Sequence, residues 1–138
     1  MERIVKTLFL TILVLNLFPQ CGNSAVLSNS LTSSQNISFE NCTKVFNTDN
    51  ISLFYLTIAS VNNNKFQLEE IQSRSGYILF KAVGRKYLAT IVNVNTNQSM
   101  LKITPVDNNY VFQPGIISNM FNFITQNVQV KPEIIVFN

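Results

Sequence analysis

Four apolar segments follow one another between residues 65 and 105, with turns of only two to four residues between them. The segments are 65–73, 77–83, 86–94 and 99–105. Such short connections join neighbouring antiparallel strands, because a parallel crossover needs about a dozen residues or more. The sequence therefore predicts a four-stranded antiparallel meander. Its two middle strands should be central, since they are apolar at nearly every position.

Local signals refine this meander. The dipeptide Gly84-Arg85 is typical of a tight hairpin between the second and third strands. In the first strand the alternation loses its phase at Glu69 and Glu70, which indicates a β-bulge. Pro105 closes the fourth strand, where its missing N–H suits a strand end or a sheet edge.

A helix is predicted on each side of the meander. Residues 51–61 form the first, and the polar residues 48–50 supply acceptors for the free amides of its first turn. The second helix starts at Pro114, whose missing N–H is harmless there, and ends near Asn127. The apolar face of the first helix consists of Ile51, Phe54, Tyr55, Ile58 and Val61.

A sheet with one apolar face must be covered, and two amphipathic helices can cover it. We therefore expect an α+β domain over residues 37–127, with both helices packed on one face of the sheet. Residues 42–47 could add a short extended segment ahead of the first helix. In the C-terminal tail, 128–138, the apolar run 134–137 either pairs with a sheet edge or stays loose.

The N-terminal residues predict export. Arg3 and Lys6 precede an uncharged and almost wholly apolar run, 7–18. A charged start followed by about 7–15 apolar residues is typical of a secretory signal peptide. The run is too short to cross a bilayer as a helix, which takes roughly 20 apolar residues. We expect residues 1–21 to be the signal peptide.

Two cleavage sites fit the residues behind the apolar run. Cys21 resembles the lipidated cysteine that becomes the first residue of a mature bacterial lipoprotein, although Gln20 stands where that pattern has a small residue. The alternative is cleavage after residues 22–24, which would release a soluble secreted protein starting at Ala25. The uncharged segment 22–36 is rich in Ser, Asn and Thr, which predicts a flexible tether.

Several common catalytic chemistries lack their residues. The chain has no His, so the usual general base and a common metal ligand are both missing. Cys42, the cysteine that remains besides Cys21, would need a nearby base to act as a nucleophile. The glycines form no phosphate-binding pattern. We therefore expect a non-enzymatic protein with no cofactor and no bound metal.

Lys81, Arg85 and Lys86 form the densest positive patch of the sequence, around the predicted hairpin. The patch could meet anionic lipid headgroups or a cell-wall polymer, while a solvated turn is the simpler interpretation. Asp107 is the most suggestive acid, and an enzyme of unrecognised type would need Asp107, Lys81 or Arg85 to converge in one cleft. A net charge of +3 is too small to indicate a nucleic-acid partner.

The signal, the tether and the small α+β domain together resemble the uncharacterised small lipoproteins of bacterial envelopes. The stretch GYILFKAVGRKYLATIVNV, followed by LKITPVDNNYVFQPG, is similar to a domain of that kind, with a hairpin meander ahead of a final helix. The resemblance implies residence in the cell envelope, a membrane anchor at Cys21 and a protein partner. It implies no activity.

Two hypotheses about function remain open. The first is a membrane-tethered interaction module that offers a sheet edge, strand 65–73 or 99–105, to a partner. The second is a carrier of a lipid or other hydrophobic ligand, in a pocket between helices and sheet that a cavity above roughly 300 Å³ would support. The residues expected to line that pocket are Phe54, Ile58, Phe80, Met120 and Phe123. A tight core with an exposed apolar patch would favour the module.

Overall fold

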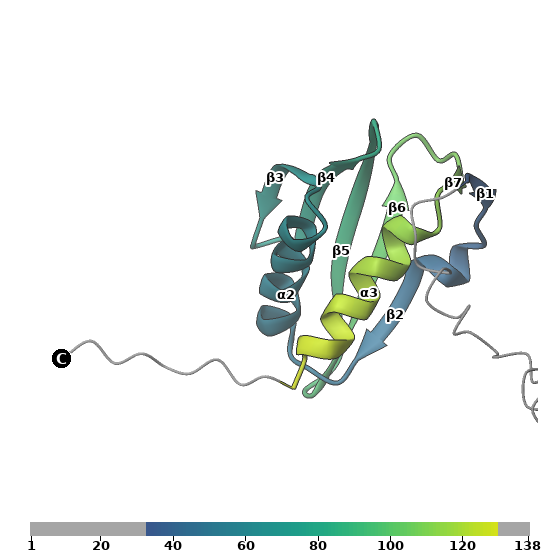
Figure 1. Ribbon diagram of the computed structural model, residues 1–138. Helices are drawn as coiled ribbons and strands as arrows, with labels where there is room; N and C mark the ends of the chain where they lie inside the picture. The colour runs from purple at the N-terminus through teal and green to yellow at the C-terminus, as the bar shows by residue number, and fades with distance from the viewer. Residues whose placement is uncertain (1–32, 130–138) are drawn as a thin grey trace, which may run out of the picture.

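The computed structural model describes residues 33–129. The expected signal peptide, the lipidation site Cys21 and the apolar run 134–137 lie outside the described residues. Within them the chain forms an α+β domain, in which two helices lie on one face of an antiparallel sheet (Figure 1). The expected fold class is therefore confirmed at this level.

The main sheet has five strands, in the spatial order β2-β6-β5-β4-β3. Their bounds are β2 Thr43–Phe46, β3 Gln67–Gln72, β4 Tyr77–Ala82, β5 Arg85–Asn95 and β6 Gln98–Pro105. Strands β3 to β6 are the expected meander, with β4 and β5 inside the sheet. The prediction of four strands was wrong, because the short extended segment over 42–47 pairs with β6 as a fifth strand.

The fifth strand changes which edges are open. Since β2 covers β6, the segment 99–105 is an interior strand, and β3 is the one predicted edge strand that lies at an edge. A second, two-stranded sheet pairs β1 (Gln35–Asn36) with β7 (Val111–Phe112). β1 thus lies within the expected tether, 22–36, and a 3-10 helix, η2 (Phe39–Cys42), leads from β1 into β2.

Two local features of the meander follow from its sequence. The expected bulge in β3 is confirmed by a shift in its register with β4 between Leu68 and Glu70. The hairpin between β4 and β5 turns at Val83 and Gly84, one residue earlier than predicted, and both residues have positive φ angles of 49° and 77°. Positive φ at both central positions is the requirement of a type I′ hairpin, and Val meets it poorly because of its branched Cβ.

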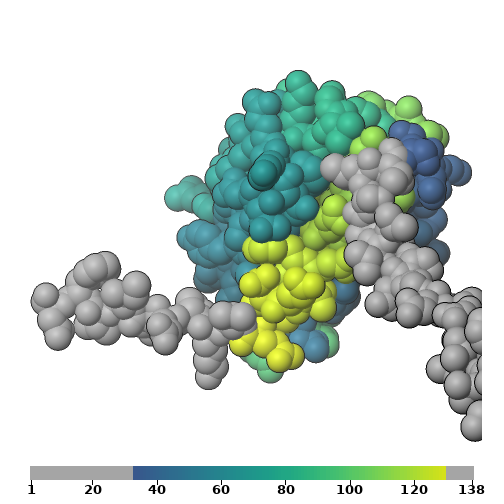
Figure 2. Space-filling model, viewed as in Figure 1, coloured from purple at the N-terminus to yellow at the C-terminus, as the bar shows by residue number. Residues whose placement is uncertain are grey.

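The helices are α2 (Asn50–Asn63) and α3 (Gly115–Asn127). Asp49 caps α2, since its carboxylate accepts a hydrogen bond from the Ser52 amide at 2.9 Å. The side chains of the two helices meet across the middle of the covered face (Figure 2). Beneath them the rings of Phe66, Phe80 and Tyr87 stack in a row with centroids 5.9 and 5.6 Å apart, so the core is built from large aromatic groups.

The packing of α2 differs from the expected helical face. Thr57 and Ser60 are fully buried, whereas Ile51 and Tyr55 are 71% and 65% exposed. The Thr57 hydroxyl donates to the Leu53 carbonyl at 2.7 Å, and the Ser60 hydroxyl donates to the Met120 carbonyl of α3 at 3.3 Å. Since Thr57 and Ser60 are on the buried side of α2, the apolar pair Ile51 and Tyr55 at the start of the helix is left outside the core.

The type I′ turn gives a direct stability test. Replacing Val83 by Asn should stabilise the domain by about 0.5–1 kcal/mol, because Asn tolerates the left-handed conformation that costs a branched residue roughly 1–2 kcal/mol. Thermal unfolding followed by circular dichroism measures the change. The control is Val106→Asn, at a similarly exposed valine outside this turn. A Val83→Asn protein no more stable than the control variant would contradict the turn geometry.

Candidate functional site

The three cations expected to form one patch lie on two faces of the sheet. Lys81 and Lys86 are direct cross-strand partners on the face away from the helices, and the Lys86 ammonium pairs with the Glu69 carboxylate at 2.8 Å. Arg85 stands opposite the buried Ala82 and extends toward the loop between β6 and β7. The separation follows from the alternation of side chains along a strand.

Arg85 and Asp107 do meet, and their contacts hold a loop in place. One guanidinium nitrogen donates to both Asp107 oxygens at 2.7 and 2.9 Å and to the Asn109 carbonyl at 2.7 Å. The other nitrogen donates to the Val111 carbonyl at 2.7 Å. The hydrogen bond from the Asn109 amide and that from Arg85 lower the pKa of Asp107. Lys81 is on the opposite face, so these three residues do not form one cleft.

Two buried groups have a structural explanation. Cys42 is fully buried, its thiol donates weakly to the Ser38 carbonyl at 3.6 Å, and burial raises its pKa, so it stays protonated at neutral pH. Burial likewise raises the pKa of Tyr87. Tyr87 and Gln113 line a cavity of about 50 Å³, and each has a buried oxygen without a partner in residues 33–129. That space suits a water molecule, which needs about 10–15 Å³ by the same measure, and is too small for a ligand.

The pocket expected between helices and sheet is occupied by the core. Phe80 and Met120 are fully buried, and Ile58 and Phe123 pack against the same cluster. Of the five expected lining residues, Phe54 also borders a hollow formed by the described residues, which lies at the edge of the helix layer. We name this hollow the α2 groove. The apolar pattern of the sequence did not predict it, because the groove depends on the rotation of α2 about its axis, that is, on which side of the helix faces the core.

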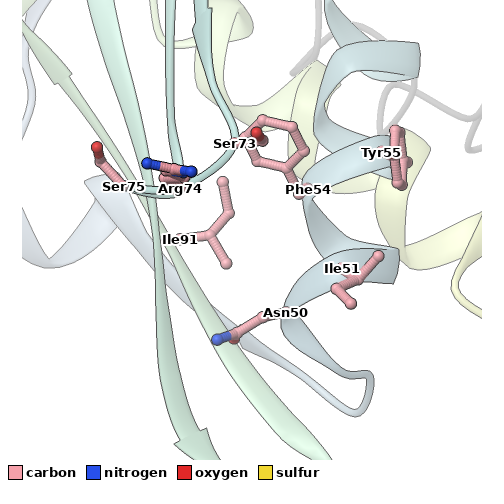
Figure 3. A pocket seen from close by; sticks show the side chains of 9 residues that line it. Asn50, Ile51, Phe54, Tyr55, Ser73, Arg74, Ser75 and Ile91 are labelled. Carbon is pink, nitrogen blue, oxygen red and sulfur yellow. The ribbon is translucent and has the colours of Figure 1, made fainter.

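The α2 groove has a volume of about 330 Å³ and runs between α2 and the turn joining β3 to β4 (Figure 3). Its lining residues are Asn50, Ile51, Phe54, Tyr55, Ser73, Arg74, Ser75, Gly76 and Ile91. Phe54 and Ile91, each 7% exposed, supply its least accessible side chains, and Phe54 points from α2 toward the turn (Figure 3). The exposed Ile51 and Tyr55 line its outer part on α2. The groove is therefore apolar along the helix and polar along the turn.

Arg74 supplies the positive charge of the α2 groove. Within residues 33–129 its guanidinium has no hydrogen bond or ion pair to another side chain, and no carboxylate lines the groove. Asn50 is bonded through its Oδ1, which accepts from the Ser99 hydroxyl at 2.6 Å, so its amide nitrogen remains a donor. The groove thus combines an apolar wall with donors and a cation.

Two further surfaces are open on this domain. On the sheet face opposite the helices, Met100 lies between Val92 and Val45 in a cross-strand row, and both valines are exposed. At the sheet edge, β3 is exposed at every residue except the half-buried Leu68. At the bulge, the Glu69 carboxylate pairs with the Lys86 ammonium, and the Glu70 carboxylate accepts a hydrogen bond from the Tyr77 hydroxyl at 2.6 Å. Both acids therefore have partners on other strands.

No family model matches the chain, and no curated protein matches it. Within residues 33–129 no helix is long and apolar enough to cross a membrane. The same part of the chain holds no group of three or more His, Cys, Asp or Glu side chains arranged to bind a metal ion.

Proposed function

We propose that the protein is an exported, non-enzymatic interaction module of a bacterial cell envelope, tethered to the membrane through Cys21. Its domain binds an extended segment of a partner protein by strand addition at the edge of β3. The observation that carries the proposal is the open β3 edge of the five-stranded sheet. Strand addition fits such an edge because the backbone groups facing away from β4 have no partner strand in residues 33–129.

The β3 edge suits binding better than the β2 edge. β2 has four residues, and the Lys44 side chain crosses from it to Thr125 of α3 at 2.9 Å. β3 has six residues, and beyond its bulge it pairs regularly with β4 over 70–72. Ile71, in the middle of this regular stretch, is 45% exposed and offers an apolar contact to an added strand. A partner strand would extend the sheet beside it.

The tether and the anchor complete the proposal. Residues 22–34 separate Cys21 from β1 and carry no charge. At roughly 3.5 Å per residue, this stretch can reach about 45 Å when fully extended. A domain anchored at Cys21 can therefore stand clear of the membrane surface and present β3 to a partner. The partner is an envelope protein and not a nucleic acid.

A second candidate function is a small carrier of a hydrophobic ligand, in the envelope or secreted. One observation favours it: the α2 groove, at about 330 Å³, reaches the size of small-molecule sites, which span about 300–1,000 Å³. The groove lies beside the core and leaves the strand edge free, so the two functions do not exclude each other.

Strand addition is tested by site-specific photo-crosslinking in the native host. A crosslinker at the exposed Gln72 should capture one defined envelope protein, and Ile71→Lys should remove that product, because an edge lysine disfavours strand pairing. The control is Val94→Lys, another exposed apolar strand residue, which should leave the product unchanged. Equal capture with and without Ile71→Lys would refute binding at this edge.

The anchor is tested by the intact mass of the protein recovered from its host. The expected mass is that of a chain starting at Cys21 plus acyl groups, and Cys21→Ser should move the protein out of the membrane fraction. An unmodified chain starting near Ala25 would contradict the anchor. The soluble carrier would then become the better proposal.

A further inference from the structure

We infer that the α2 groove is a binding site for a small apolar carboxylate, such as an aryl- or alkyl-carboxylic acid. The hydrocarbon part would lie between Ile51, Tyr55 and the more buried Phe54 and Ile91, and the carboxylate would meet Arg74. The inference deepens the second candidate function, the carrier. It does not depend on strand addition at β3, because the groove is lined by residues 73–76 of the β3–β4 turn and not by the regular stretch of the strand edge, 70–72.

The apolar wall of the groove lies on the first two turns of α2. Ile51 and Tyr55 are one helical turn apart and point to the same side of α2, although both are largely exposed. The Tyr55 ring meets the Phe54 ring edge-on, with centroids 5.9 Å apart. The groove therefore presents an aromatic corner beside two isoleucines, which an apolar body can cover.

The charge of the groove selects the polar end of the ligand. Arg74 is unpaired in the described part of the chain, in contrast to Arg85, whose guanidinium makes four hydrogen bonds. Asp49, in the neighbouring hollow, is already bonded to the amide and hydroxyl of Ser52, which lower its pKa. A guanidinium without a carboxylate partner matches a ligand carboxylate, which it can hold through two parallel hydrogen bonds.

Both walls of the groove are fixed before any ligand binds. On the sheet side the Gly76 carbonyl accepts from the Ile91 amide at 2.8 Å. Gly76 has a φ of +66°, and a Cβ there would lie 3.0 Å from the Ile91 carbonyl oxygen, so the turn sits closely on β5. On the helix side the Asp49 cap and the Asn50–Ser99 hydrogen bond hold the start of α2. A preformed site loses little freedom on binding.

The probe pair is 4-phenylbutyrate and the neutral 4-phenylbutan-1-ol, which share a carbon skeleton. Each probe is titrated into the isotopically labelled protein in its processed form, and binding is followed by the amide chemical shifts of the protein. We expect saturable shifts confined to residues 50–55, 73–76 and 91, with the acid bound about 10-fold more tightly than the alcohol, as one charge-assisted hydrogen-bonded pair supports.

Variants separate the two halves of the site. Arg74→Gln should bring the affinity for the acid down to that for the alcohol and leave the alcohol unchanged. Tyr55→Ser should weaken both probes several-fold, and its fold should persist because the side chain is mostly exposed. The matched controls are Lys81→Gln and Val94→Ser, a cation and an exposed valine outside the groove, and both should bind like the unchanged protein.

Three results would overturn the inference: shifts that do not saturate, shifts centred outside the groove, or an acid preference that survives Arg74→Gln. Ile71→Lys, which removes the proposed partner strand, should leave both titrations unchanged. Failure of strand addition and failure of the groove are therefore distinguishable results.

Discussion

The contact between α2 and α3 sets the arrangement on which the proposed ligand site depends. Thr57 and Ser60 are fully buried on the inner side of α2, and the Ser60 hydroxyl donates to the Met120 carbonyl of α3. Small side chains let two helices approach, and hydrogen bonds to backbone carbonyls offset the cost of burying their hydroxyls. With this side of α2 turned inward, Ile51 and Tyr55 must face outward. The α2 groove follows from that rotation.

The sheet contributes a second constraint through side-chain alternation. Because Lys86 and Arg85 are neighbours on β5, they serve opposite faces, one pairing with Glu69 and the other holding the β6–β7 loop through Asp107. Two charges that are adjacent in sequence therefore form separate structural ion pairs on opposite faces of the sheet. Arg74 lies in the β3–β4 turn, outside the paired strands, and its guanidinium has no side-chain partner in residues 33–129, so it remains available to a ligand.

The sequence predicts best what depends on local pattern. The meander, the cap at Asp49 and the bulge near Glu69 all have signals within a few residues, and all are present in the structure. β2 was not predicted as a strand of the sheet, because four residues are too short to show alternation and its partner β6 lies more than fifty residues away. The hairpin turn lies one residue earlier than predicted, because Val83 is a poor candidate for the positive φ that it adopts there.

The candidate site was harder to predict than the fold. The apolar pattern assigns Thr57 and Ser60 to the surface and Tyr55 to the core. In the structure Thr57 and Ser60 are buried and Tyr55 is exposed. The meeting of Arg85 with Asp107, and of α2 with the turn at Arg74, also requires the tertiary structure. The presence of the small polar residues Thr57 and Ser60 in an otherwise apolar helix is the sequence signal that could have indicated which side of α2 faces the core.

The rotation of α2 is tested most directly by hydroxyl-radical footprinting of the tyrosines, read by mass spectrometry. Tyr55 should react fastest and Tyr87 slowest, since their exposed fractions are 65% and 0%. Tyr77 and Tyr110, which are half-buried, should fall between them. A Tyr55 protected as strongly as Tyr87 would place it in the core, and the α2 groove would not exist.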